Sequence, residues 1–328
     1  MSYPFSDGIE TRSHINHYKR RDVFLCQQEG HRAFDYRVSV YHVLKEKRCY
    51  PHGCVSFSWK CSRFAKGSSC SRGFRRVGRM CFGCKFFIDE KINHRPRVVL
   101  SPARFDAFKN ELREFESWLR DFRGREVNFS GTVFSVKPNA AIDPSRNWRT
   151  SFHGFLLVFK EGFVNLVRWK DFCYVRVSGR VQERYRFRPG DKVDFFARLT
   201  EDRGRIILIG INRVEIDHRA EGSWWNASKA RVALQTGRII DGQPDKCLNC
   251  GGGCLVDVKP SHGMSSGVHR RLFCLEGVKD PRFCTRGRVG EETWDGCGAP
   301  PRKLSGSNNL TTLSNVAISH VIRTVDSP

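Results

Sequence analysis

Cysteine constrains this chain more than any other residue type, because twelve of its 14 cysteines fall in two segments. The first segment holds Cys49, Cys54, Cys61, Cys70, Cys81 and Cys84. The second holds Cys247, Cys250, Cys254, Cys274, Cys284 and Cys297. The start of the sequence lacks the apolar core of a secretory leader, so we expect a cytoplasmic protein with reduced thiols. Reduced thiols at this density predict metal binding, and a disulfide-bonded protein without a leader is the alternative.

The spacing of the cysteines indicates how a metal is held. Two residues separate Cys81 from Cys84 and Cys247 from Cys250, the spacing at which a backbone knuckle points two thiolates at one metal. Four thiolates hold either a structural Zn²⁺ or a [4Fe-4S] cluster. We expect Zn²⁺ and keep the iron–sulfur cluster as the alternative, because Cys254 lies unusually close to the second knuckle for a zinc ribbon. Spacing leaves open which four of each six cysteines bind.

Positive charge is the second strong signal. The chain has 57 Lys and Arg against 34 Asp and Glu, a net charge of +23. The excess is concentrated in residues 1–100, which carry 20 basic and 8 acidic side chains. A segment with this charge attracts polyanions, of which nucleic acid is the first candidate; a charge that serves solubility alone is the alternative.

Basic and aromatic residues alternate within the first cysteine segment. From Lys60 to Lys85 there are eight basic residues and no acidic one, with Trp and Phe between them. Guanidinium groups match phosphate oxygens and aromatic rings stack on unpaired bases, so we predict a nucleic-acid surface. The alternative is that these cations only neutralise a thiolate site. The candidate contact residues are Arg63, Lys66, Arg72, Phe74, Arg75, Arg76 and Arg79.

One long amphipathic helix is predicted over residues 101–122. Ser101 suits the N-cap, Pro102 the first helical position, and Gly124 the stop. Apolar side chains recur every three or four positions along it, at Phe105, Phe108, Leu112, Phe115, Leu119 and Phe122. We expect this stripe to dock on the domain that follows. A dimeric coiled coil is the alternative, for which the helix is short.

Five strand-like runs follow, and they predict a small closed barrel. They cover residues 126–136, 154–169, 173–181, 190–200 and 204–216, and Asp202-Arg203-Gly204 forms a hairpin turn between the last two. Gly131, GDKVDFFARLT and RIILIGINRVEI resemble OB-fold domains of the replication-protein-A and anticodon-binding kinds, over about residues 125–216. The resemblance implies binding of single-stranded nucleic acid or of a protein partner. The short link after the third run departs from it, because the usual helix has little room there.

The alternation of the predicted strands defines a possible binding face. Val175 and Val177 point inward, and Cys173 faces the core. The outward candidates for nucleic-acid contact are Tyr174, Arg176, Arg180, Phe196 and Arg198. Outward aromatic and basic residues suit single-strand binding, whereas a covering helix or cysteine segment would hide them.

These observations predict an α+β, mainly β protein: a central OB-like five-stranded barrel with a preceding amphipathic helix, flanked by two small cysteine-rich metal-binding modules. The expected divisions are a basic cysteine-rich module at 1–95, helix and barrel at 96–220, a second cysteine-rich module at 221–300, and a flexible tail at 301–328. No apolar run is long enough to span a membrane.

The expected function is binding of RNA or single-stranded DNA by a metal-containing protein. No phosphate-cradling, nucleophile-elbow, zinc-protease or dinucleotide signature occurs, so we assign no catalytic residue and lean against an enzyme. An iron–sulfur protein with a redox, sensing or enzyme-accessory role is the first alternative. A scaffold that binds a protein partner is the second.

Overall fold

The computed structural model describes residues 13–259 and 269–284, and these divide into two compact units. The first unit contains residues 13–55 and 93–283, and the second is built on residues 56–92. Predicted ligand Cys297 and the predicted tail at 301–328 lie outside the described residues.

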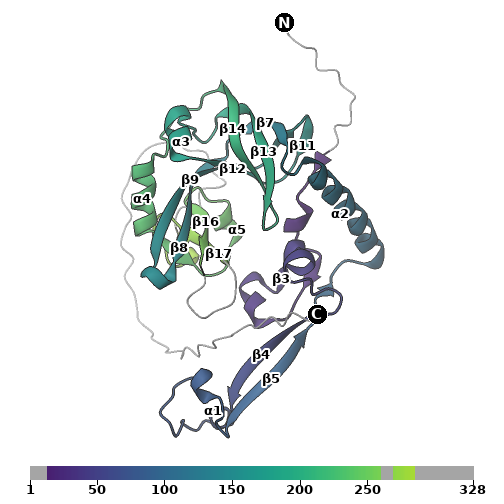
Figure 1. Ribbon diagram of the computed structural model, residues 1–328, viewed down its shortest axis with the longest axis vertical. Helices are drawn as coiled ribbons and strands as arrows, with labels where there is room; N and C mark the ends of the chain where they lie inside the picture. Colours follow the sequence, from purple (N-terminus) through teal and green to yellow (C-terminus); the bar gives the residue numbers. More distant parts are fainter. Residues whose placement is uncertain (1–12, 260–268, 285–328) are drawn as a thin grey trace, which may run out of the picture. The chain divides into compact units, whose positions relative to one another are not determined.

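A mixed sheet of twelve strands forms most of the first unit, in the order β1-β11-β10-β7-β13-β14-β12-β9-β8-β16-β17-β15 (Figure 1). Three neighbouring pairs are parallel, β1 with β11, β12 with β14, and β8 with β16, and the others are antiparallel. The strands are β1 (Ser13–His14), β7 (Glu126–Thr132), β8 (Ser135–Asp143), β9 (Arg149–Phe159), β10 (Gly162–Val164), β11 (Val167–Trp169), β12 (Cys173–Val177), β13 (Lys192–Asp202), β14 (Arg205–His218), β15 (Arg238–Ile240), β16 (Gly253–Val258) and β17 (His269–Cys274).

The predicted five-stranded closed barrel is wrong. Its five runs became parts of a larger sheet, and run 154–169 became the end of β9 together with β10 and β11. A barrel would require β7 and β8 to close the sheet on itself. Instead β7 pairs with β10 and β13, and β8 pairs with β9 and β16, so both find partners from other segments. The described residues therefore form an extended mixed sheet and no closed barrel.

The predicted amphipathic helix is confirmed as α2 (Pro102–Phe122), the longest helix in the described residues. Its buried residues are Phe108, Leu112, Phe115, Trp118 and Leu119, and they belong to the main core of the first unit. Phe115 and Trp118 lie 6.2 and 5.4 Å from the ring of Trp169 on β11. The stripe thus docks within its own chain, as expected, because large aromatic side chains gain most from such burial.

Shorter helical segments cover the sheet and connect its strands. In the first unit they are α3 (Gly179–Tyr185), α4 (Ala227–Thr236), α5 (Asp245–Leu248), the 3₁₀ turns η1 (His17–Lys19), η2 (Glu29–Phe34), η5 (Pro144–Arg146) and η6 (Pro281–Phe283), and the π-helical turn η3 (His42–Glu46). The helix α3 lies in the link that we predicted to be too short for one, because Val177 ends β12 early and Ser178 caps the helix through Val181 N–H.

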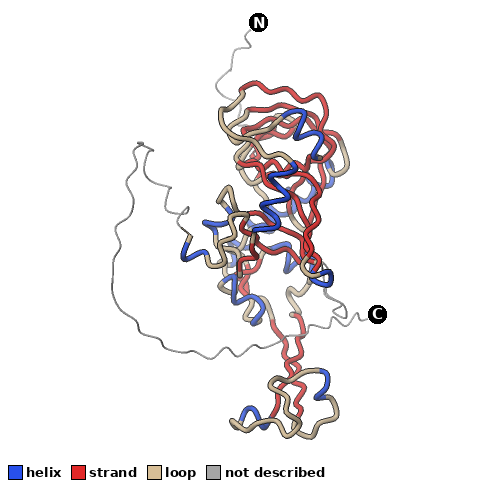
Figure 2. Tube along the Cα trace, turned by 90° about the vertical axis from the view of Figure 1, so that its left-hand side faces the viewer, coloured by secondary structure: helices blue, strands red, loops and turns tan. Residues whose placement is uncertain are grey.

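Two smaller sheets accompany the main sheet. In the first unit, β2 (Phe24–Leu25) pairs antiparallel with β3 (Arg37–Val38) and with β6 (Arg97–Val98). The strands β4 (Cys54–Cys61) and β5 (Phe87–His94) pair with each other (Figure 2), and residues 54–55 and 93–94 of this pair belong to the first unit and the rest to the second. In its described residues, the second unit adds the short helix α1 (Ser62–Ala65) and the 3₁₀ turn η4 (Arg79–Cys81). None of the described helices is both long and apolar enough to cross a membrane.

Candidate functional site

Four cysteines of the second unit line one small hollow. Cys61 ends β4, Cys70 lies in the loop after α1, Cys81 ends η4, and Cys84 follows it. Phe64, Phe74 and Phe87 line the same hollow together with Arg72, Arg76 and Val77. The hollow therefore gathers four of the six cysteines predicted in the first segment, from positions spread over 24 residues of sequence.

Backbone N–H groups are directed at one of these sulfurs. Arg72 N–H donates to the Cys70 sulfur at 3.4 Å. Hydrogen bonds from the backbone of Arg72 and then of Phe74 lower the pKa of the Cys70 thiol. Because the thiolate is the form that binds metal, this arrangement favours Cys70 as a ligand. The Cys81–Cys84 knuckle is closed by a hydrogen bond from Cys84 N–H to the Cys81 carbonyl at 3.0 Å.

The predicted architecture of two flanking cysteine-rich metal-binding modules is nevertheless wrong for the described residues. No three of their His, Cys, Asp or Glu side chains are arranged as a metal-holding group. The first segment is also divided between units, because Cys49 and Cys54 belong to the first unit and the other four to the second. The spacing of the cysteines in the sequence could not reveal this division, because the boundary between the units falls within β4, after Val55.

Cations and aromatic rings lie close together in the second unit, and some of them line the hollow. The guanidinium of Arg63 lies 5.3 Å from the ring of Phe86, and that of Arg72 lies 5.1 Å from Phe74. The other predicted contact residues, Lys66, Arg75, Arg76 and Arg79, are exposed. Among the described residues, Lys66, Arg75 and Arg76 form no ion pair with a carboxylate, so their charge is directed to solvent. We call Arg63, Lys66, Arg72, Phe74, Arg75, Arg76 and Arg79 the basic surface.

The second cysteine segment is split between two faces of its hairpin. Cys247 and Cys274 are buried in one small core, and the sulfur of Cys250 accepts Gly252 N–H at 3.4 Å. Cys254 is buried in a different core, since β16 pairs Cys254 with Phe273 and Gly253 with Cys274. Adjacent residues of a strand point to opposite faces, so Cys254 points away from Cys274. Cys254 is a core residue with 2% exposure, and this burial raises its pKa to about 12. Cys284 is half-buried after η6.

Two of the outward residues predicted on the strands lie in one row of the sheet, whereas Tyr174 and Phe196 stand opposite Ile207 and Asn212. Arg176 on β12 and Arg198 on β13 both stand opposite Ile209 on β14, one from each side. Residues opposite one another in a sheet share a face, so these two arginines flank Ile209 about 10 Å apart. Both are exposed, and Phe196 is half-exposed with Arg213 at 5.3 Å from its ring. Arg180 does not join this row, because it lies in α3.

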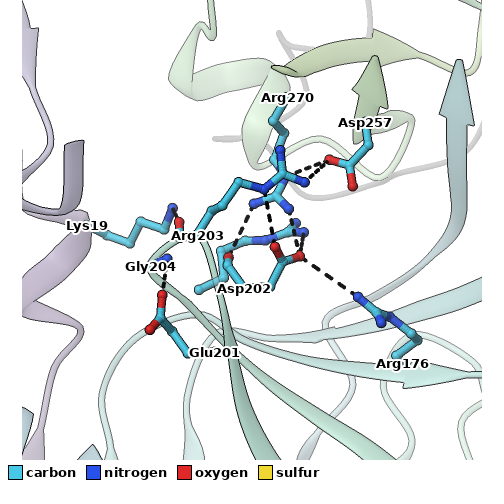
Figure 3. A network of polar contacts seen from close by, with 9 residues as sticks. Lys19, Arg176, Glu201, Asp202, Arg203, Gly204, Asp257 and Arg270 are labelled. Carbon is cyan, nitrogen blue, oxygen red and sulfur yellow. Dashed lines mark hydrogen bonds and ion pairs between the residues drawn. The ribbon is translucent and has the colours of Figure 1, made fainter. Parts of the chain in front are cut away.

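Next to this row, a network of charged groups joins the β13–β14 hairpin to β12, β16 and β17 (Figure 3). The Asp202 carboxylate accepts from Arg270 at 2.7 Å and Arg205 at 3.2 Å, and Arg176 lies at 3.8 Å. Asp257 on β16 pairs with Arg203 at 2.8 Å and Arg270 at 3.2 Å. Lys19 donates to the Arg203 carbonyl at 3.2 Å. The hairpin is thereby tied to segments far away in the sequence.

Because the arginines of this network are largely buried, their charges depend on the Asp202 carboxylate for neutralisation. The side chains of Arg205, Arg270 and Asp202 are 6%, 11% and 24% exposed. Burial alone would raise the pKa of Asp202, but Arg270, Arg205 and Arg203 together lower it to about 2. Burial lowers the pKa of Arg205 to about 10. Only Arg176 of this group was predicted, because no local pattern connects Asp202 to Arg270.

We compared the chain with known proteins and found no relative. No protein-family model, no curated protein and no solved structure matches the chain.

Proposed function

We propose that this protein binds single-stranded nucleic acid, RNA or DNA, through the basic surface of its second unit. The observation that carries the proposal is a hollow lined by four cysteines together with half-buried phenylalanines and the exposed Arg72 and Arg76. The row of Arg176 and Arg198 on the main sheet supplies further cationic contacts in the first unit.

Residues 56–92 of the second unit lack an apolar core that would hold their backbone in place. Across residues 56–92, all of which are described, no apolar side chain is buried. Its largest aromatic contacts, among Trp59, Phe82 and Phe87, leave the rings partly exposed. Units of this size without a core need metal ions or disulfides for stability.

The donors at the hollow fit a metal better than they fit disulfides. Cys61, Cys70, Cys81 and Cys84 would supply the four thiolates of a structural Zn²⁺ site, and a knuckle and N–H···S bonds accompany them. Bound metal would fix the loops that display Arg63, Arg72 and Phe74. Metal and nucleic-acid binding are thus linked, because the same loops carry both sets of residues.

The geometry of the basic surface suits flexible single strands. Guanidinium groups stacked on phenyl rings present flat surfaces for bases, and the neighbouring exposed cations are available to phosphates. The described part of the second unit contains only the four-residue helix α1 and the turn η4, so the basic surface has no helix long enough to enter the groove of a duplex.

A salt titration of the full chain tests the proposal. Labelled single-stranded RNA and DNA are titrated by fluorescence anisotropy over a series of salt concentrations. Replacing Lys66, Arg75 and Arg76 with Ala should weaken binding and reduce the slope of log K against log salt by about 2, since each phosphate contact to a single strand contributes about 0.7.

A matched variant removes the same charge elsewhere. Arg104, Arg120 and Arg123 are exposed on α2 and its C-cap, and their replacement by Ala should leave the slope unchanged. Equal slopes for the two triple variants, or binding that does not respond to salt, would overturn the proposal. Retrieval of one specific protein by a chain that ignores both oligonucleotides would favour the scaffold alternative.

Metal identity is decided separately. Protein purified without oxygen should be colourless and contain zinc. Four thiolates at the hollow would fill all four coordination positions of a structural Zn²⁺. A brown protein with visible absorption and stoichiometric iron and sulfide would replace Zn²⁺ by the iron–sulfur alternative.

A further inference from the structure

Three cysteines from separate parts of the sequence lie together in the first unit, away from the hollow already described. Cys26 directly follows β2, while Cys49 and Cys54 stand at the two ends of one short turn. Cys26 and Cys49 are 1% and 4% exposed, and Cys54 packs against the same core. Cys26 belongs to neither of the two cysteine segments, so the sequence did not associate it with the others.

Two stretches that carry these cysteines have the same pattern. Residues 26–31 read Cys-Gln-Gln-Glu-Gly-His, and residues 49–54 read Cys-Tyr-Pro-His-Gly-Cys. Each places two metal donors with four residues between them and glycine before the second, a spacing found for ligand pairs in structural zinc sites. Gly53 has φ +94°, and a Cβ there would lie 2.5 Å from the Asn93 side-chain oxygen. The second turn therefore requires glycine.

The first of these stretches is held in a closed loop. Cys26 N–H donates to the Tyr36 carbonyl at 2.9 Å, and Tyr36 N–H donates to the His31 carbonyl at 3.1 Å. Asp35 and Tyr36 adopt φ of 53° and 60°, a left-handed conformation that costs free energy in residues other than glycine. The loop therefore keeps η2, which carries His31, folded back toward Cys26.

The three thiols of the two stretches are neighbours. The thiols of Cys49 and Cys54 share a hydrogen bond, and Cys26 is close enough to interact electrostatically with both. The Nδ1 atom of His31 is buried and has no hydrogen-bond partner in the described part of the chain. Burial of a polar nitrogen without a partner is costly, and a bond to metal would remove that cost.

A second histidine packs against the first but is already engaged. The rings of His31 and His42 meet edge to face with centroids 5.1 Å apart. The Nδ1 of His42 bonds to the Glu46 carboxylate at 2.8 Å. His42 is thus placed to support the ring of His31, whose own Nδ1 is available for a ligand bond.

From this juxtaposition we propose that Cys26, His31, Cys49 and Cys54 bind one structural Zn²⁺. Three thiolates and one imidazole make a closed zinc set. The three thiols are neighbours, but the four donors do not converge as a metal-holding group in the described residues, so binding requires rotation of side chains. The bound ion would join the turn after η3 to the loop after β2, and so fasten residues 26–54 to the core of the first unit.

Zinc content of the full chain, purified under reducing conditions, tests the site. Cys26→Ser and Cys54→Ser should each lose one zinc ion per chain relative to the unchanged protein. His31→Cys should retain that ion, because a fourth thiolate replaces the imidazole. Two matched controls should retain it as well: Cys173→Ala, which removes a buried cysteine of the main core, and His42→Asn.

Replacing zinc with Co²⁺ gives an absorption spectrum that reports directly on the thiolates bound to the metal, so loss of a ligand can be told from unfolding. Co²⁺ in this site should show thiolate-to-metal charge-transfer absorption that decreases in Cys26→Ser and increases in His31→Cys. Cys61→Ser with Cys81→Ser should remove a different ion and leave this signal in place, which separates the site from the proposed function. Unchanged zinc in Cys26→Ser and Cys54→Ser, loss of zinc in His42→Asn with retention in His31→Asn, or a Cys49–Cys54 disulfide in protein trapped without reductant would overturn the assignment.

Discussion

Replacing Asp202 should lower the stability of the first unit while changing the side-chain volume very little. Its carboxylate accepts from Arg205 and Arg270, whose side chains are only 6% and 11% exposed. Asp202→Asn keeps the shape but removes the negative charge that these two guanidinium groups face. Arg205 then has no carboxylate partner among the described residues, because Asp257 pairs with Arg203 and Arg270.

The magnitude follows from the pKa of Asp202. The network lowers it from the ordinary value of 3.8 to about 2. A pKa difference of this size between folded and unfolded chains corresponds to about 2 kcal/mol of stability, and loss of one partner from a buried ion pair costs about 3–5 kcal/mol. We expect Asp202→Asn to lower the free energy of unfolding by about 2–4 kcal/mol at pH 7.

The sign of the pH dependence can be worked out. A carboxyl with a lowered folded pKa stabilises the fold above its unfolded pKa, and this contribution is lost as pH falls through the folded value. The difference between the unchanged protein and Asp202→Asn should therefore be constant above about pH 5 and shrink between about pH 4 and pH 2.

Urea unfolding followed by tryptophan fluorescence measures this difference at each pH. Asp217→Asn is the matched control, since Asp217 is an exposed carboxylate on β14 outside the network, and it should change stability by less than about 0.5 kcal/mol. A cost below about 1 kcal/mol at pH 7, or a difference that does not shrink in acid, would show that the buried arginines do not depend on this carboxylate.

Two further predictions concern the core and the second cysteine segment. Phe115→Ala should lower the free energy of unfolding by about 3–5 kcal/mol, because Phe115 is 1% exposed between Trp118 and Trp169; Ser117→Ala, on the exposed side of α2, is the control, and equal urea midpoints would contradict the docking of the helix. Gly253→Ala should lower the melting temperature by several degrees in differential scanning fluorimetry, since its Cβ would lie 2.0 Å from the Cys247 carbonyl oxygen; Gly251→Ala meets no atom within 4 Å and should melt as the unchanged protein does.

Local sequence patterns predicted the local elements well. Apolar side chains at spacings of three and four fix the face of a helix, so α2 and its docked stripe could be expected from the spacing alone. Alternation placed Val175 and Val177 inside, and Asp202-Arg203-Gly204 formed the expected hairpin turn with Arg203 and Gly204 at positive φ. These features depend only on residues close together in the chain.

The same reasoning failed for elements without a clear local pattern. β8 reads SVKPNAAID, with no run of large apolar residues, and it forms because β9 and β16 pair with it on either side. The resemblance to OB-fold domains and the proposed binding of nucleic acid stay predictions. The expected closed barrel is wrong, because the strands that should have closed it pair with strands from elsewhere.

Residue order alone was enough to show that the chain is cysteine-rich, strongly basic and mainly β, and to locate the long helix. Which cysteines are neighbours depends on tertiary contacts: four line a hollow in the second unit, Cys254 is in a core, and Cys49 and Cys54 lie with Cys26 in the first unit. Folding also brings Arg270 to Asp202 across 68 positions. The two levels differ because strand pairing and burial are satisfied over the whole chain, whereas spacing and periodicity report only what neighbouring residues prefer.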